Sequence, residues 1–278
     1  MKVVCRNWIR AAVCLGLSAI FLSYQPSSNA SQRRTRNDPQ EKEQKEKERE
    51  RESREERERE HEKERENKLI ARLMAGNARF VSGIRRPSNY KRERGMLTKD
   101  QHPFAVVVTC SDSRVPPELI FDESLGQLFV VRTAGNVIDP VVLGSVEYAV
   151  KYLNVGLVVL LGHDSCGAVK AAIEGGNFSQ NMDAVLTKIK PAIGNARAKH
   201  SDAKDLLSFA IEENVEVQLA ALLHGAAIAE AFEFKGLKVA RGVYHLNSGK
   251  VSLTEFKFVN EEEERERERE KKERRPGE

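Results

Sequence analysis

The sequence predicts an α/β fold, with a mostly parallel central sheet of about four parallel strands and one antiparallel edge strand, flanked by helices on both faces. Short apolar runs alternate with segments of helical period through residues 67–260. The runs are apolar at consecutive positions, which is typical of strands buried on both faces. The last two runs are separated by the turn 247–249, which indicates an antiparallel hairpin at the edge of the sheet.

The first expected element is a helix, because apolar residues recur at helical spacing from Leu69 to Val81 before Gly83 ends the run. The later elements alternate in type, and their apolar pattern decides between strand and helix. Strands are expected at 105–109, 128–131, 157–161, 237–244 and 251–256. Helices are expected at 142–153, 166–173, 185–196 and 206–223.

The N-terminal 30 residues have the layout of a secretory signal peptide. Lys2, Arg6 and Arg10 make a basic start, and the apolar stretch Ala11–Tyr24 is too short to cross a bilayer, which takes about 20 residues. Small residues then precede a cleavage site after Ala30. We therefore expect a protein that is exported to the periplasm or outside the cell, with no membrane segment after cleavage. The alternative is an uncleaved signal that anchors the chain to the membrane.

Two charged arms flank the predicted folded domain, which covers residues 67–260. Residues 41–66 contain 13 Glu and ten Lys or Arg and no apolar residue, and the tail 261–278 is of the same kind. Such segments cannot pack into a core, although Glu–Arg pairs at helical spacing support a helix. We interpret 31–66 as a solvated spacer that fluctuates between helix and coil, and 261–278 as a disordered or helical tail. An interaction arm is the alternative interpretation.

The charge of the chain argues against a nucleic-acid partner. The formal net charge is +4, and the charges of the signal peptide and the arms cancel, so this mild excess lies in residues 67–260. No polybasic stretch accompanies it in the sequence, as a nucleic-acid-binding face would require.

Two thiols and an imidazole follow neighbouring strands of the predicted sheet. Cys110 comes directly after the strand 105–109, and His163 and Cys166 come directly after the strand 157–161. Sites in open α/β sheets form at the carboxyl ends of the strands, so these side chains are expected at one edge. Two cysteines and one histidine are ligands that suit a tetrahedral zinc ion with one open position. The alternative is structural: in an exported protein the two cysteines could form a disulfide.

Several motifs resemble those of the β-class carbonic anhydrases. They are CSDSRVPPELIF, LFVVRTAGN, SVEYAV and GHDSCGAVKAA, with LMAGNARFVSG before them and GVYHLNSGKV after them. The likeness extends over about residues 67–259, and the charged arms have no counterpart in that family. The resemblance implies the reversible hydration of carbon dioxide to bicarbonate and a proton by a zinc-bound hydroxide, in a homodimer or a higher homo-oligomer with one zinc per chain.

The resemblance also implies roles for single residues. Cys110, His163 and Cys166 are the expected zinc ligands. Asp112 and Arg114 are the expected catalytic dyad, in which Arg114 holds Asp112 ionised through a two-pronged ion pair. In a closed form, Asp112 could become a fourth zinc ligand. The expected substrate-binding residues are Gln101, Phe129, Ala134, Tyr148 and Gly167.

Two other functions stay open at this point. One is the hydrolysis of carbonyl sulfide or carbon disulfide on the same fold with the same metal ligands. The other is a non-enzymatic exported domain in which Cys110 and Cys166 form a disulfide.

Overall fold

The chain divides into two compact units, Met1–Arg51 and Glu52–Glu278. The computed structural model describes residues 39–200 and 205–257, so the predicted signal peptide and the charged tail lie outside the described residues. In the first unit, the described residues 39–51 are helical, and side chains 43–51 are exposed. The sheet and the helices that cover it belong to the second unit.

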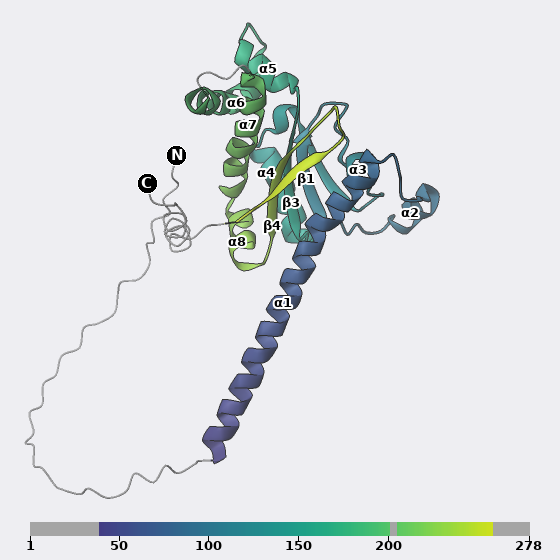
Figure 1. Cartoon of the computed structure of the whole chain (residues 1–278), viewed down its shortest axis with the longest axis vertical. Coiled ribbons are helices and arrows are strands. Elements are labelled where there is room, and N and C mark those ends of the chain that lie inside the picture. The colour runs from purple at the N-terminus through teal and green to yellow at the C-terminus, as the bar shows by residue number, and fades with distance from the viewer. Residues whose placement is uncertain (1–38, 201–204, 258–278) are drawn as a thin grey trace, which may run out of the picture. The chain divides into compact units, whose positions relative to one another are not determined.

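The elements confirm the predicted alternation of strands and helices (Figure 1). The strands are β1 (Ala105–Cys110), β2 (Leu128–Thr133), β3 (Leu157–His163), β4 (Lys238–Tyr244) and β5 (Val251–Phe256). The helices are α1 (Pro39–Val81), α2 (Tyr90–Met96), α3 (Pro117–Ile120), α4 (Pro140–Tyr152), α5 (Gly167–Glu174), α6 (Gln180–Lys199), α7 (Leu206–Leu223) and α8 (Ala226–Phe234), and a 3₁₀ turn η1 (Ala134–Asn136) follows β2.

The five strands form one sheet in the order β2-β1-β3-β4-β5. The first four are parallel, and β5 is antiparallel to β4, as the sequence predicts. The register aligns Cys110 with Thr133 on one side of β1 and aligns His163 with Tyr244 at the ends of β3 and β4. The carboxyl ends of the parallel strands therefore meet at one edge of the sheet.

Side chains of the central strands β1 and β3 are buried on both faces of the sheet. Alternate residues point to opposite faces, as strand geometry requires. Helices α4, α7 and α8 cover one face, and α3 with the C-terminal turns of α1 covers the other. The residues under the first group are Val106, Val108, Val158, Leu160 and Val239, and those under the second are Ala105, Val107, Leu157, Val159 and Leu161.

The C-terminal turns of α1 are fixed to the domain by close backbone contacts. A Cβ atom on Gly76 would lie 1.7 Å from the carbonyl oxygen of Phe121, so only glycine fits where α1 meets this loop. The buried Asn77 side chain donates to the carbonyl oxygens of Ile120 and Gly249, at 3.2 and 2.8 Å, and accepts from the amide of Val251. These C-terminal turns are therefore part of the folded domain.

Helix α1 extends further towards the N-terminus than the apolar pattern indicates. It runs without a break over 43 residues, so the predicted boundary between spacer and domain at residue 67 lies inside a helix. Pairs four residues apart, such as Lys47 and Glu43 at 2.7 Å, supply local support for its charged part.

Three short helices were not predicted. Helix α2 has no buried residue, and α3 has only four residues, so neither carries an apolar periodicity long enough to detect. Helix α8 follows α7 after Gly225 and bends away from it by 89°. Among the described residues, no single helix is long and apolar enough to cross a membrane, and only α7 and α8 taken together reach that length and composition.

Deletion of residues 31–66 and 261–278 is expected to leave the thermal unfolding midpoint nearly unchanged. These segments contain almost no apolar side chains, so they add little to a core. A matched truncation that also removes residues 67–75 takes away the fully buried Leu73 and should cost at least about 2–5 kcal/mol of unfolding free energy. A large fall in the midpoint for the first deletion would show that the arms pack after all.

Candidate metal centre

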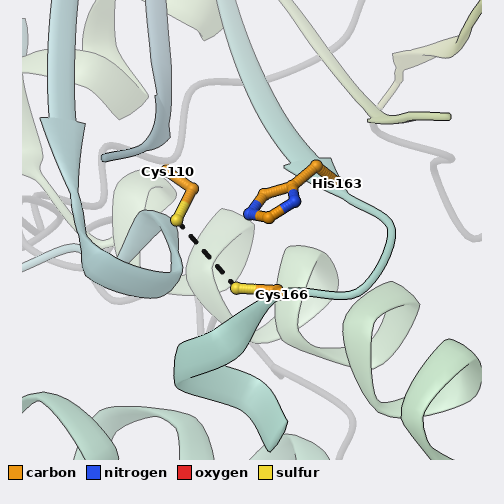
Figure 2. A group of neighbouring side chains, drawn as sticks. All are labelled: Cys110, His163 and Cys166. Carbon is orange, nitrogen blue, oxygen red and sulfur yellow. Dashed lines mark hydrogen bonds between the residues drawn. The ribbon is translucent and has the colours of Figure 1, made fainter. Parts of the chain in front are cut away.

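Three potential metal ligands converge at the carboxyl edge of the sheet. Cys110 and His163 are the last residues of β1 and β3, and Cys166 directly precedes α5. Their ligand atoms all lie within 4.8 Å of one another, and all three residues are buried. Figure 2 shows the three side chains pointing toward one another from separate elements. The structure therefore brings together the residues that the sequence predicts as ligands.

The spacing of the two sulfur atoms fits a shared metal ion. Cys110 Sγ and Cys166 Sγ lie 4.0 Å apart, and both thiols are free. A disulfide needs about 2.05 Å. Two sulfurs on a tetrahedral zinc ion, each at about 2.3 Å from it, would lie about 3.8 Å apart. The observed distance matches the metal geometry.

One nitrogen of His163 has the environment of a metal ligand. The Nδ1 atom lies 2.8 Å from the carbonyl oxygen of Asp164, which can only accept, so Nδ1 carries the proton. The other nitrogen, Nε2, is buried and has no hydrogen-bond partner among the described residues. Its nearest carboxylate oxygen, Oδ2 of Asp112, is 4.0 Å away. A buried acceptor without a partner is costly, and a zinc ion would satisfy it.

The two thiols share one negative charge. A hydrogen bond from Cys166 lowers the pKa of Cys110 to about 4 against the effect of burial, and His163 and the amides of Asp112 and Gly135 add to this. The same hydrogen bond raises the pKa of Cys166, because a second thiolate beside the first is unfavourable, and burial raises it further. A divalent cation carries the two positive charges that would balance two thiolates, so its binding would allow both thiols to ionise.

The turn η1 supplies a backbone donor to the site. The amide of Gly135 donates to Cys110 Sγ at 3.3 Å. Gly135 has φ 66°, in the left-handed region that favours glycine, and a Cβ atom there would lie 2.7 Å from Cδ1 of Ile189, so that side chain would have to move for a larger residue. The buried Asn214 of α7 donates to the Gly135 carbonyl oxygen at 2.9 Å and fixes the turn. Neither Gly135 nor Asn214 was predicted as a site residue; a glycine two residues after the end of a strand was the available signal.

Asp112 and Arg114 form the predicted pair beside the three ligands. Arg114 Nε and its backbone amide each donate to Asp112 Oδ1 at 2.9 Å, and Nη2 donates to Oδ2 at 2.8 Å. The Arg114 hydrogen bond holds the pKa of Asp112 well below its usual range. Asp112 is therefore ionised at neutral pH and is turned toward Arg114. Its Oδ2 atom is close to His163, so the carboxylate lies at the margin of the metal site.

A second arginine holds the backbone of the same loop. Arg132, near the end of β2, donates through Nε to the carbonyl oxygen of Cys110 at 3.0 Å and through Nη2 to that of Asp112 at 2.5 Å. It thereby fixes both residues relative to β2. No role was predicted for Arg132, although a lone charge in the apolar strand LFVVRT was a usable signal.

The predicted substrate-binding residues fall into two groups. Ala134 and Gly167 lie at the carboxyl edge of the sheet, directly beside Gly135 and Cys166. The other three lie toward the opposite edge of the sheet, where the parallel strands begin. Gln101 precedes β1, and Phe129 pairs with Val106 near the starts of β2 and β1. Tyr148 of α4 packs against Phe129, with 6.3 Å between the ring centroids.

That second group is distant from the ligands of the same chain. Four residues of strand separate Val106 from Cys110, which corresponds to about 13 Å. The structure therefore does not bring Gln101, Phe129 and Tyr148 to the metal site within one chain. A cavity of about 330 Å³ also lies toward the edge where the parallel strands begin. Its lining includes Gly156 and Leu237, which directly precede β3 and β4, so the cavity is away from the three candidate ligands.

Comparison with known proteins points to one family. Residues 105–251 match the family model described as carbonic anhydrase. The chain is 42% identical over 186 residues to the carbonic anhydrase of Mycolicibacterium smegmatis, and the aligned region covers 65% of this chain and 89% of that protein. It is 40% identical over 189 residues to carbonic anhydrase 2 of Mycobacterium tuberculosis, and the aligned region covers 66% of this chain and 90% of that protein.

Solved structures give the same result. The β-carbonic anhydrase CafA of Aspergillus fumigatus is similar with a TM-score of 0.56 and 29% identity, over 65% of this chain and 88% of that one. A β-carbonic anhydrase of Sordaria macrospora, described as tetrameric, is similar with a TM-score of 0.54 and 26% identity, over 69% of this chain and 100% of that one.

Proposed function

Because the chain belongs to the β-carbonic anhydrase family, we propose that it catalyses the reversible hydration of carbon dioxide to bicarbonate and a proton with one zinc ion per chain. Cys110, His163 and Cys166 would hold the zinc ion and leave a fourth position open. When bound, zinc supplies a Lewis acid that lowers the pKa of water from about 15.7 toward 7.

The residues around the zinc position would orient the reactants. Asp112 is an anion held at the margin of the site by Arg114, so its free lone pairs can accept a hydrogen bond from a water molecule and orient it. The pairing with Arg114 also keeps Asp112 from turning onto the metal position, which would close the site. Ala134 adds a small apolar side chain beside the site, which suits an apolar gas.

The observation that carries the zinc assignment is the buried Nε2 of His163, which has no hydrogen-bond partner among residues 39–200 and 205–257 and faces two thiols 4.0 Å apart. The test combines metal analysis with a stopped-flow assay of carbon dioxide hydration on the purified protein. We expect close to one zinc per chain and rapid hydration. A metal-free protein with a Cys110–Cys166 disulfide would overturn the proposal. The same assay with carbonyl sulfide distinguishes the alternative hydrolase.

We also propose that a second copy of the chain completes the substrate site. Gln101, Phe129 and Tyr148 lie toward the other edge of the sheet, and Tyr148 is 45% exposed although it belongs to an aromatic cluster with Phe129 and Tyr152. An exposed aromatic cluster of this kind suits an interface between copies, and one similar protein is described as tetrameric. Light scattering on the purified protein tests this, and a monomer with full activity would contradict it.

Zinc binding should strengthen by about tenfold for each pH unit between about pH 7 and 9, because the metal displaces one proton from the thiol pair. The pKa of Cys110 is lowered to about 4, so this thiol is already ionised, whereas the raised pKa of Cys166 keeps its proton in place until zinc arrives. Burial lowers the pKa of His163, but its interactions with Cys110, the Asp164 carbonyl and Asp112 together raise it, so the dependence should steepen where His163 also has to lose a proton. Chelator competition at several pH values measures this, and an affinity independent of pH would contradict it.

A further inference from the structure

The loop that carries two of the three proposed ligands is strained. His163 and Cys166 are separated by two residues, of which Ser165 has φ 53°, in the left-handed region that non-glycine residues rarely adopt. Backbone in such a conformation persists only where the surroundings hold it in place. The contacts that hold this loop therefore decide how well the two ligands are presented to a metal ion.

Asp164 is the residue through which the loop is held. Its carbonyl oxygen accepts from His163 Nδ1 at 2.8 Å, and its amide donates to the carbonyl oxygen of Tyr244 at the end of β4. Its carboxylate accepts from Nδ1 of His245 at 3.2 Å. The position of the Asp164 carbonyl sets the orientation of the His163 ring, so whatever fixes Asp164 also fixes the ligand.

His245 is itself fixed by the turn between β4 and β5. Its amide donates to the carbonyl oxygen of Lys250 at 2.8 Å, and its Nε2 accepts from the hydroxyl of Ser252 at 2.9 Å. A carboxylate can only accept, so Nδ1 carries the ring proton and donates it to Asp164, and Nε2 is then free to accept from the Ser252 hydroxyl. The side chain of His245 is 40% exposed.

We infer that His245 is a positioning residue for the metal centre, which acts through Asp164 to hold the ring of His163 in the orientation that zinc requires. The inference rests on the proposed zinc site. Partners that orient a metal-ligating histidine are worth about 10–100-fold in metal affinity, and His245 acts one residue further out, so the lower end of that range applies.

The test measures zinc affinity by chelator competition on the full chain, with H245A, H245N and H224A beside the wild type. We expect H245A to weaken zinc binding by about tenfold. H245N keeps a donor at the position of Nδ1 and should stay within about threefold of the wild type. H224A removes a side chain whose ring nitrogen Nδ1 bonds to the Ala220 carbonyl of the preceding helix, away from the metal site, and it should change nothing.

A double-mutant cycle separates positioning from a general effect on folding. If His245 acts through Asp164, the H245A/D164A double variant should bind zinc no more weakly than D164A alone. Equal affinity in H245A and wild type, or an H245N variant as weak as H245A, would overturn the inference and leave the zinc site standing. If the wild type itself binds no zinc, the proposed function fails first. Thermal unfolding of the metal-free forms shows whether H245A lowers stability instead.

Discussion

The Cys166→Ser variant is expected to lose zinc and catalytic activity together. Cys166 directly precedes α5, and its sulfur lies 4.0 Å from that of Cys110, at the separation expected for two ligands of one tetrahedral ion. A serine hydroxyl stays protonated at neutral pH and is a poor ligand for zinc, so one of three protein ligands disappears. We expect a loss of at least about a hundredfold in zinc affinity, since structural zinc sites gain about 10–16 kcal/mol from their complete ligand sets.

The measurement is zinc content per chain beside the hydration rate, in the presence of a weak chelator. Ser111→Ala is the matched control, because Ser111 follows Cys110 directly, its side chain is exposed, and its backbone amide keeps its bond to the Thr133 carbonyl in either variant. The control should keep both zinc and activity. A Cys166→Ser protein that retains one zinc ion and the wild-type rate would exclude Cys166 as a ligand.

The Arg114→Ala variant should keep its zinc but react about 30- to 1000-fold more slowly, which corresponds to about 2–4 kcal/mol for a lost preorganised electrostatic partner. Arg114 is the main cause of the low pKa of Asp112, so its removal lets that pKa rise toward the ordinary value of about 3.9. Asp112 therefore remains ionised at pH 7 in the variant. The expected loss comes from the position of the carboxylate, which becomes free to turn onto the zinc ion.

Two further variants check this explanation. Arg114→Lys keeps the positive charge but cannot form the two-pronged contact with Oδ1 and Oδ2, so its rate should fall between those of Arg114→Ala and the wild type. Asp112→Ala should retain the metal, because the three ligands are unchanged, and lose most activity. An Asp112→Ala variant as fast as the wild type would overturn this role for the dyad while the zinc site remained.

Much of the fold follows from local sequence pattern. The continuous apolar runs at β1 and β3 predict strands buried on both faces, and the structure buries every residue of both strands. The three proposed zinc ligands were also accessible from the sequence, since Cys110 and His163 end such runs and the carboxyl ends of parallel strands must meet at one edge. The helix Leu206–Leu223 has the bounds that its apolar periodicity predicts.

The tertiary structure alone decided how these residues are supported. The donors to the site, Gly135 and Arg132, come from a neighbouring strand and its turn, and Asn214 comes from a helix about 80 residues away. Such contacts join a side chain to a backbone atom of another element, so they leave no periodicity in the sequence. They depend on strand order and register, which are set by the packing of the whole sheet.

The same reason explains His245 and the substrate residues. His245 reaches Asp164 only because β4 pairs with β3 in the register that places Tyr244 beside His163. Motif resemblance assigns Gln101, Phe129 and Tyr148 to the substrate site, and only the direction of β1 shows that they lie toward the other edge of the sheet. The sequence by itself determined the strand pattern and predicted the three side chains that the structure brings together as candidate ligands. The pairing of distant strands decided which groups surround each ligand, because those distances are fixed only when the sheet is assembled.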